Sequence, residues 1–313
     1  MSILTTSSGQ ASSSAPAGAA DAVPEPDTSA RGAKPGGSTR RRRRGPNAQL
    51  VVGGGLIALI ALAALVSLVW TPYDPTHAVA VDRLQSPSLA HLMGTDRYGR
   101  DVLSGIMAGA QITLLVGTVS VLIGAAIGVP FGILAGMRPK RLGVLIMGGS
   151  DVVMAFPGLL LAIVFGAVFG GGTLSAMIAL GIGSAPAFAR VARSGTLQVM
   201  AMDYIFAARA ANRSGLAIAL RHVVPNIGGM VIVQCSVNFA IAVLAEAGLS
   251  FLGLGTLPPT PSWGRMLLDA QQFLATSAYL AVFPGVAIAL AVLGFNLLGD
   301  GLRDRFDPKM RNR

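Results

Sequence analysis

Residues 102–137 read VLSGIMAGAQITLLVGTVSVLIGAAIGVPFGILAGM, a run that contains no charged side chain. An α-helix rises ~1.5 Å per residue, so about 20 apolar residues cross a bilayer core. The run is too long for one upright span and barely long enough for two. Three cations, Arg138, Lys140 and Arg141, follow it. Because such charges stay on the inner side, we expect one span preceded by an interfacial helix of about 8 to 10 residues.

The composition of the 313 residues excludes an ordinary cytosolic enzyme. Hydrophobic side chains make up 52% and charged ones only 12%, about half the charge of a typical soluble domain. The 40 glycines suit close helix packing in lipid. The single Cys235 excludes a disulfide framework and a cysteine-based metal site. The sequence therefore predicts an all-α membrane protein.

Other apolar runs complete a set of six predicted transmembrane helices. They lie at 50–69, twice within 142–189 around a glycine turn at 170–173, at 222–264 and at 270–299. With the N-terminus inside, four of the 24 Lys and Arg residues fall outside, which leaves 20 inside. The four are Arg83, Arg97, Arg100 and Arg265. This bias predicts that both termini are cytoplasmic.

The chain divides into two predicted parts. Residues 1–48 are rich in Ser, Ala, Gly and Pro and end in the arginine run 40–44, which predicts a disordered basic arm. We expect this arm to rest on anionic lipid as a tether. Residues 49–313 form the expected transmembrane domain, with a charged inner loop at about 197–222.

No residue pattern for catalysis is present in the sequence. The lysines do not follow a phosphate-binding glycine loop, and the three histidines do not form an H-E-x-x-H zinc motif. Two acidic residues lie within apolar runs that are expected to be inside the membrane, where an unpaired charge is costly. For Asp151 we favour a structural pair with an arginine over a pathway role. For Glu246, an outer gate, an interhelical hydrogen bond and a substrate contact remain open.

Small residues and prolines indicate how the spans pack. Glycines recur every four residues at Gly124, Gly128, Gly132 and Gly136. We interpret this row as a surface for close approach of another span. Prolines within the predicted spans should kink or unwind them locally, and they are Pro130, Pro157, Pro186 and Pro284.

The inner segment from Gln198 to Arg221 is too charged to span and too long for a turn. Its stretch 204–212 is rich in Ala and Arg, which predicts a short surface helix. The small side chains of Ala207, Ala208 and Ala211 could fit a groove of another protein. An amphipathic loop that rests on lipid headgroups is the alternative.

Five ordered motifs resemble one family. YIFAARA at 204–210, followed by RHVVPN at 221–226, is similar to the E-A-A loop of membrane permease subunits of ABC importers, in the dipeptide/oligopeptide/nickel group and its short-outer-loop type. Phe206 replaces the usual Glu, and Asn212 stands where Gly is usual. The other blocks are GTDRYGRD at 94–101, Asp151 with Phe156-Pro157, EAGLSFLGLG at 246–255 with PSWG at 261–264, and NLLGDGLRD at 296–304 with Asp307-Pro308.

The resemblance implies a type I ABC importer permease fold in the bacterial inner membrane and a mechanism. A second permease subunit would complete the pathway, two ATPase subunits would bind the ATP and dock inside, and an external binding protein would deliver the substrate. The chain itself would hold no cofactor and no catalytic residue. The implied ATPase-coupling residues are Tyr204, Phe206, Ala207, Ala208, Arg209, Ala211, Asn212, Arg221, His222, Pro225 and Asn226.

Two functions follow as hypotheses. The first is an importer permease for dipeptides or oligopeptides, with nickel, glutathione or other small solutes as variants and with no nucleic-acid partner. The second is a stand-alone channel or membrane sensor whose arginine arm binds nucleic acid or other acidic partners. A channel should conduct alone, whereas an importer needs its other subunits.

Overall fold

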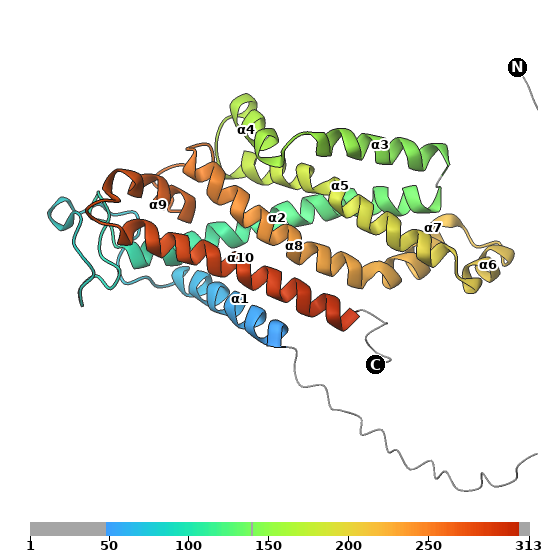
Figure 1. The fold of residues 1–313 in the computed structure, drawn as a ribbon, viewed down its shortest axis with the longest axis horizontal. Helices are drawn as coiled ribbons and strands as arrows, with labels where there is room; N and C mark the ends of the chain where they lie inside the picture. The colour runs from blue at the N-terminus through green and yellow to red at the C-terminus, as the bar shows by residue number, and fades with distance from the viewer. Residues whose placement is uncertain (1–47, 139, 307–313) are drawn as a thin grey trace, which may run out of the picture. The chain divides into compact units, whose positions relative to one another are not determined.

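The computed structural model describes residues 48–138 and 140–306, whose regular structure is helical (Figure 1). The basic arm, apart from Ala48, and the motif Asp307-Pro308 lie outside these ranges. The helices are α1 Ala48–Ser67, α2 Val102–Met137, α3 Arg141–Ala155, α4 Gly158–Phe169, α5 Thr173–Met200, α6 Asp203–Ala210, α7 Gly215–Ile218, α8 Val224–Phe251, α9 Trp263–Ala270 and α10 Tyr279–Phe306. Short 3₁₀ helices cover Ala80–Asp82 and Gln271–Phe273, and a π-helical segment, Ala219–Val223, joins α7 to α8.

Five helical stretches are each long and apolar enough to cross a membrane. They are α1, α2, α5, α10 and the stretch 215–251, which consists of α7, the π segment and α8. Helices α3 and α4 pass the same test only as a pair, and they meet at an angle of 79°. Counted as one broken span, this pair brings the total to six. The structure confirms the predicted all-α membrane fold, and the predicted six spans are reached when the bent pair counts as one span.

Helix α2 is a single helix of 36 residues, about 54 Å long at the usual rise per residue. Its first 8 to 10 residues, predicted as an interfacial lead-in helix, are continuous with the rest of the helix, and their interfacial position stays a prediction. Asp101 caps the helix, because its carboxylate accepts a hydrogen bond from the backbone N–H of Ser104 at 2.8 Å. No break follows within the helix, so the turns after this cap continue directly into the span.

The last two spans begin at other residues than predicted. Helix α7 begins at Gly215, upstream of His222, where the Ser214 hydroxyl caps it by accepting a hydrogen bond from the Ala217 N–H at 3.3 Å. The sixth span begins at Tyr279 instead of Ala270. The residues before it form α9, whose N-terminus is capped by the Ser262 hydroxyl.

The four prolines predicted to kink their spans behave differently. At Pro157 the span breaks, and α3 and α4 separate there. A proline has no N–H to donate and crowds the preceding turn, which favours such a break. At Pro130, Pro186 and Pro284 the helices continue without interruption.

The glycine row on α2 packs against α5. A Cβ atom added at Gly128 would lie 2.2 Å from the carbonyl oxygen of Ala185, and one at Gly132 would lie 2.3 Å from that of Ala189. Real side chains do not tolerate such distances, so only glycine permits these helices to approach so closely. This confirms the interpretation of the row as a packing surface.

The ends of the spans gather at opposite ends of the bundle (Figure 1). The α6 end holds α6, the ends of α2 and α5 and the start of α7. The start of α1 and the end of α10 point the same way along the bundle but stop short of α6. The α9 end holds the loop 68–101, α9 and the start of α10. Gly301, near the end of α10, lies against Leu50, near the start of α1, and Gly94 lies against Tyr279 at the α9 end.

Candidate functional site

Helix α6 lies at the surface of the molecule, and one of its side chains is fully buried. Ile205 is fully buried and belongs to an apolar cluster with Ile133, Val223 and Ile227. The side chains of Tyr204 and Phe206 on either side of it are about half exposed. The predicted surface helix at 204–212 is therefore confirmed, with bounds of Asp203–Ala210.

The three alanines that the sequence suggested for docking do not share one environment. Ala207 and Ala211 are exposed, whereas Ala208 is partly buried and packs against the cluster of Ile205. Ala208 follows Ile205 by three residues, a spacing that places both on the same helix face. That periodicity could have shown at the sequence level that Ala208 points inward. The exposed alanines of α6 and its C-cap are Ala207, Ala210 and Ala211.

Three side chains link α6 to the start of the next span. The rings of Tyr204 and His222 lie 5.7 Å apart between centroids. The side-chain amide of Asn226 donates one hydrogen bond to the His222 carbonyl at 2.6 Å and a longer one to the Tyr204 hydroxyl at 3.4 Å. We call Tyr204, His222 and Asn226 the brace, since together they fix α6 relative to α8.

The C-terminus of α6 explains the asparagine found where the family has glycine. Asn212 has a φ of +52°, a left-handed conformation that Gly adopts freely and Asn tolerates better than most residues. The N–H of Asn212 donates to the Arg209 carbonyl, and the N–H of Arg213 donates to the Ala208 carbonyl. This pair of bonds is a Schellman motif. Asn212 therefore preserves the geometry of the helix end.

The remaining residues of the predicted set lie around this helix. The Arg209 guanidinium lies over the Phe206 ring, 6.0 Å from its centroid. Arg221 is exposed in the π segment, and Pro225 follows that segment directly in the first turn of α8. The structure thus brings all eleven predicted coupling residues into one region of the α6 end.

Asp151 forms the structural pair that the sequence favours. Its carboxylate accepts a hydrogen bond from the Arg190 guanidinium at 2.6 Å. The contact joins α3 to α5. Both side chains are about half exposed in the isolated chain, so we expect the pair to add little stability by itself.

Glu246 is almost fully buried near the end of α8. It accepts hydrogen bonds from the hydroxyl of Ser250 at 2.6 Å and from that of Thr256 at 3.3 Å. The Thr256 N–H in turn donates to the Ser250 oxygen at 2.9 Å. Among the described residues, these hydrogen bonds connect α8 to its own following turn, not to another span. Glu246 therefore holds the chain reversal after the fifth span.

Comparison with known proteins identifies the family. The model of the family described as "Binding-protein-dependent transport system inner membrane component" matches residues 128–312. The chain belongs to this family. It is a membrane-embedded permease subunit of an ATP-driven importer, and ATP hydrolysis belongs to other subunits of such importers.

Curated relatives match most of the permease. The glutathione transport system permease protein of Pectobacterium atrosepticum is 41% identical over 272 residues, which cover 86% of this chain and 90% of that protein. The di/tripeptide transport system permease protein of Pseudomonas aeruginosa is 41% identical over 267 residues, with coverage of 83% and 88%.

Solved structures support the fold of the permease. An inward-facing crystal structure of the MetNI methionine ABC transporter matches with a TM-score of 0.53 and 19% identity, covering 64% of this chain and 94% of that one. A second crystal form of the same transporter gives a TM-score of 0.55. At this identity the likeness concerns the fold alone, and it confirms the predicted type I importer fold.

Proposed function

We propose that this permease forms half of an import pathway for dipeptides or oligopeptides. A second permease subunit forms the other half, two ATPase subunits dock at the α6 end, and an external binding protein delivers substrate at the α9 end. The observation that carries the proposal is the exposed helix α6, anchored by Ile205 and held by the brace. The curated relatives, named for glutathione and di/tripeptide transport, support the substrate class.

The geometry of α6 suits energy coupling. A docking helix must offer a surface that a groove can approach closely, and Ala207 and Ala211 provide it. It must also transmit movement of the docked ATPase to the spans without changing its own position relative to them. The brace connects α6 to α8, and Ile205 connects it to residues of α2, such as Ile133. Movement of a docked ATPase would therefore reach two spans directly.

We place the α6 end and both termini in the cytoplasm, because 20 of the 24 Lys and Arg residues then lie inside. Residues 1–48 would serve as a basic tether to anionic lipid, separate from the transport domain at 49–313. A cysteine introduced at Ser88 should react with an impermeant thiol reagent added outside, and one at Ser214 should not. The native Cys235 is replaced by Ser in both variants, and the opposite labelling pattern would refute the orientation.

Reconstitution tests the transport function. Liposomes that contain both permeases and both ATPases should accumulate labelled alanyl-alanine only when ATP and the binding protein are present. Labelled glutathione, supplied in a parallel experiment, distinguishes the two substrate classes named among the relatives. If this chain alone conducts ions in a planar bilayer and the complete complex imports neither solute, the channel hypothesis replaces the proposal.

A further inference from the structure

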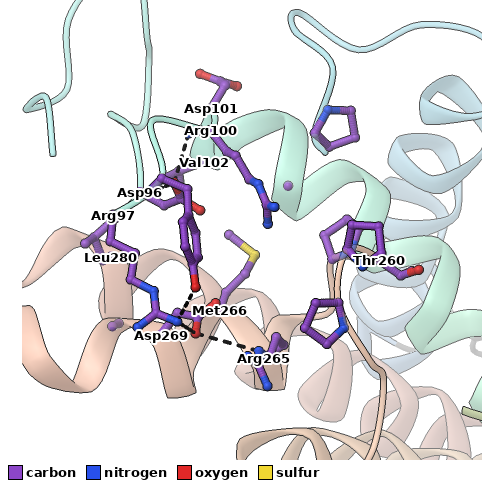
Figure 2. A pocket seen from close by; sticks show the side chains of 17 residues that line it. Asp96, Arg97, Arg100, Asp101, Val102, Thr260, Arg265, Met266, Asp269 and Leu280 are labelled. Carbon is purple, nitrogen blue, oxygen red and sulfur yellow. Dashed lines mark hydrogen bonds and ion pairs between the residues drawn. The ribbon is translucent and has the colours of Figure 1, made fainter. Parts of the chain in front are cut away.

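A cavity of about 220 Å³ lies at the α9 end, at the opposite end of the bundle from α6 (Figures 1 and 2). It is bounded by the loop residues 96–101, the turn Pro258–Pro261 and helix α9. Figure 2 shows Arg100 reaching toward its interior from the start of α2, with Arg265 and Asp269 on the opposite side. The apolar side chains of Met266 and Leu280 complete its wall.

Hydrogen-bond donors in this cavity exceed the acceptors that the protein offers them. In the described part of the chain, five buried side-chain polar atoms have no hydrogen-bond partner. Three of the five are the Nε atoms of Arg97, Arg100 and Arg265, and all three arginines line the cavity. Buried donors are normally paired because leaving them unpaired is costly. Their concentration at one place shows that, among the described residues, the arginines beside this cavity are not fully paired.

The carboxylates of the cavity are already engaged. Asp269 accepts a hydrogen bond from Arg97 at 2.9 Å and lies 3.6 Å from the Nε of Arg265. Asp96 accepts the backbone N–H groups of Tyr98 and Arg100 at 2.7 and 2.9 Å. Among the described residues, no carboxylate lies within ion-pair distance of the Arg100 guanidinium.

The third acid beside the cavity is Asp101, and its hydrogen bonds are formed with other groups. Asp101 accepts hydrogen bonds from the Ser104 N–H and hydroxyl, both at 2.8 Å, and its other oxygen lies 3.0 Å from the Nδ1 of His91. Figure 2 shows its carboxylate directed away from Arg100. The Arg100 guanidinium reaches toward the cavity and lies 4.9 Å from the centroid of the Tyr98 ring. Its Nε is buried, so its terminal NH groups are the donors that can meet a ligand.

We infer that this cavity binds one carboxylate group, with Arg100 as its principal donor and Arg265 as a second. A guanidinium matches a carboxylate in two parallel hydrogen bonds. Nearby Asp96 and Asp269 disfavour a doubly charged ligand such as phosphate. The volume is below that of drug-sized sites, so the end of a peptide or one acidic side chain enters rather than a whole substrate.

Two sources could supply such a carboxylate. One is the C-terminus of a peptide on its way to the pathway, and the other is an Asp or Glu side chain on the docking face of the external binding protein. Only the choice between these sources rests on the proposed import function. Carboxylate binding itself can be measured without ATP, transport or any other subunit, so the two ideas fail separately.

Arginine labelling tests the inference in the full chain, reconstituted in lipid nanodiscs. Phenylglyoxal modifies accessible arginines, and mass spectrometry gives the rate at each one. N-acetylalanine should slow modification of Arg100 about tenfold at ten times its dissociation constant, while the matched N-acetylalanine amide should not. Arg83, which is exposed and lies outside the cavity, serves as the internal control. Equal protection by acid and amide, or no protection by the acid, would overturn the inference.

Two further additions to the same assay identify the source. Protection of Arg100 by alanyl-alanine, but not by the binding protein, assigns the carboxylate to substrate, and the reverse result assigns it to the docked protein. The variant Arg100→Gln should weaken acid binding about 10- to 100-fold, measured as lost protection of Arg265. Arg83→Gln should leave protection intact. Unchanged protection of Arg265 in Arg100→Gln would refute the role of Arg100.

Discussion

The two ends of this permease differ in how much of their surface is packed against the rest of the chain. At the α9 end, contacts between distant parts of the chain predominate: the Tyr279 hydroxyl donates to the Gln85 carbonyl, and the Trp263 indole N–H donates to the Ile106 carbonyl, both at 2.9 Å. At the α6 end, α6 is anchored mainly by Ile205 and leaves most of its residues exposed. The first end is stabilised from within, whereas the second offers surface to a partner.

This difference separates two kinds of mutational effect. A side chain at the α9 end contributes to the folding of the chain, so its loss should lower stability whatever else is bound. An exposed side chain of α6 contributes to contact with another subunit, so its change should lower coupling at constant stability. Substitutions of similar size at the two ends should therefore give different readouts.

We expect the largest effect from Trp263→Ala at the α9 end. Trp263 is almost fully buried against α2, and removing a buried aromatic side chain typically costs about 3 to 5 kcal/mol of unfolding free energy. Thermal unfolding in nanodiscs measures it. Trp263→Phe, which keeps most of the volume but loses the hydrogen bond to Ile106, should cost clearly less. A normal melting temperature for Trp263→Ala would contradict the conclusion that internal contacts stabilise this end.

The next effect is at α6. Ala207→Trp should leave the melting temperature unchanged but weaken ATPase docking, because overpacking a contact costs about 1 to 3 kcal/mol, roughly 5- to 150-fold in association. Co-purification and substrate-stimulated ATP hydrolysis measure this. Ala78→Trp, an exposed site at the opposite end, is the matched control and should be neutral in both assays.

Ala208→Trp sharpens the same comparison. Since Ala208 packs against the cluster of Ile205, a tryptophan there should lower stability and docking together. Wild-type docking by both alanine variants would show that α6 is only a surface loop, and the coupling proposal would fail.

A smaller effect is expected at the end of α6. Asn212→Val should cost about 1 to 2 kcal/mol, because a β-branched residue resists the left-handed conformation. Asn212→Gly should be neutral, since glycine adopts that conformation freely. Stimulated ATP hydrolysis, compared between the two variants, checks the effect. Equal losses in both would mean that the Asn212 side chain itself contacts the partner.

The smallest effects belong to exposed side chains of α6 that do not need close approach. Arg209→Ala should reduce stimulated hydrolysis only about twofold, because exposed charges contribute little. Phe206→Glu, which restores the family's residue, should retain co-purification if the ATPase offers a basic partner. A complete loss of coupling in Arg209→Ala would instead place this guanidinium inside the docking contact.

The sequence predicts local features of this molecule better than long-range ones. Run lengths and charges predict the six spans, and the alanine-rich stretch predicts α6. The partner of Glu246 within its own helix, Ser250, lies four residues on and could have been expected from helix periodicity. Its second partner, Thr256, depends on how the chain reverses after α8, which no local pattern specifies.

The cavity at the α9 end shows the same limit. Arg100 and Arg265 are far apart in the chain, and they line one cavity because α9 forms in the short segment between the fifth and sixth predicted spans. The GTDRYGRD motif indicated that residues 94–101 matter, but not that they face α9.

The break at Pro157 determines what can surround this part of the molecule. The first N–H groups of α4 have no side-chain cap, and residues 154–160 are exposed on the isolated chain. Hydrocarbon tails offer no acceptor to such groups, so lipid-facing irregular backbone is not found in the membrane core. The side of the chain that carries the break must therefore be wetted or covered by protein. The other spans, whose backbones are continuous, can border lipid directly.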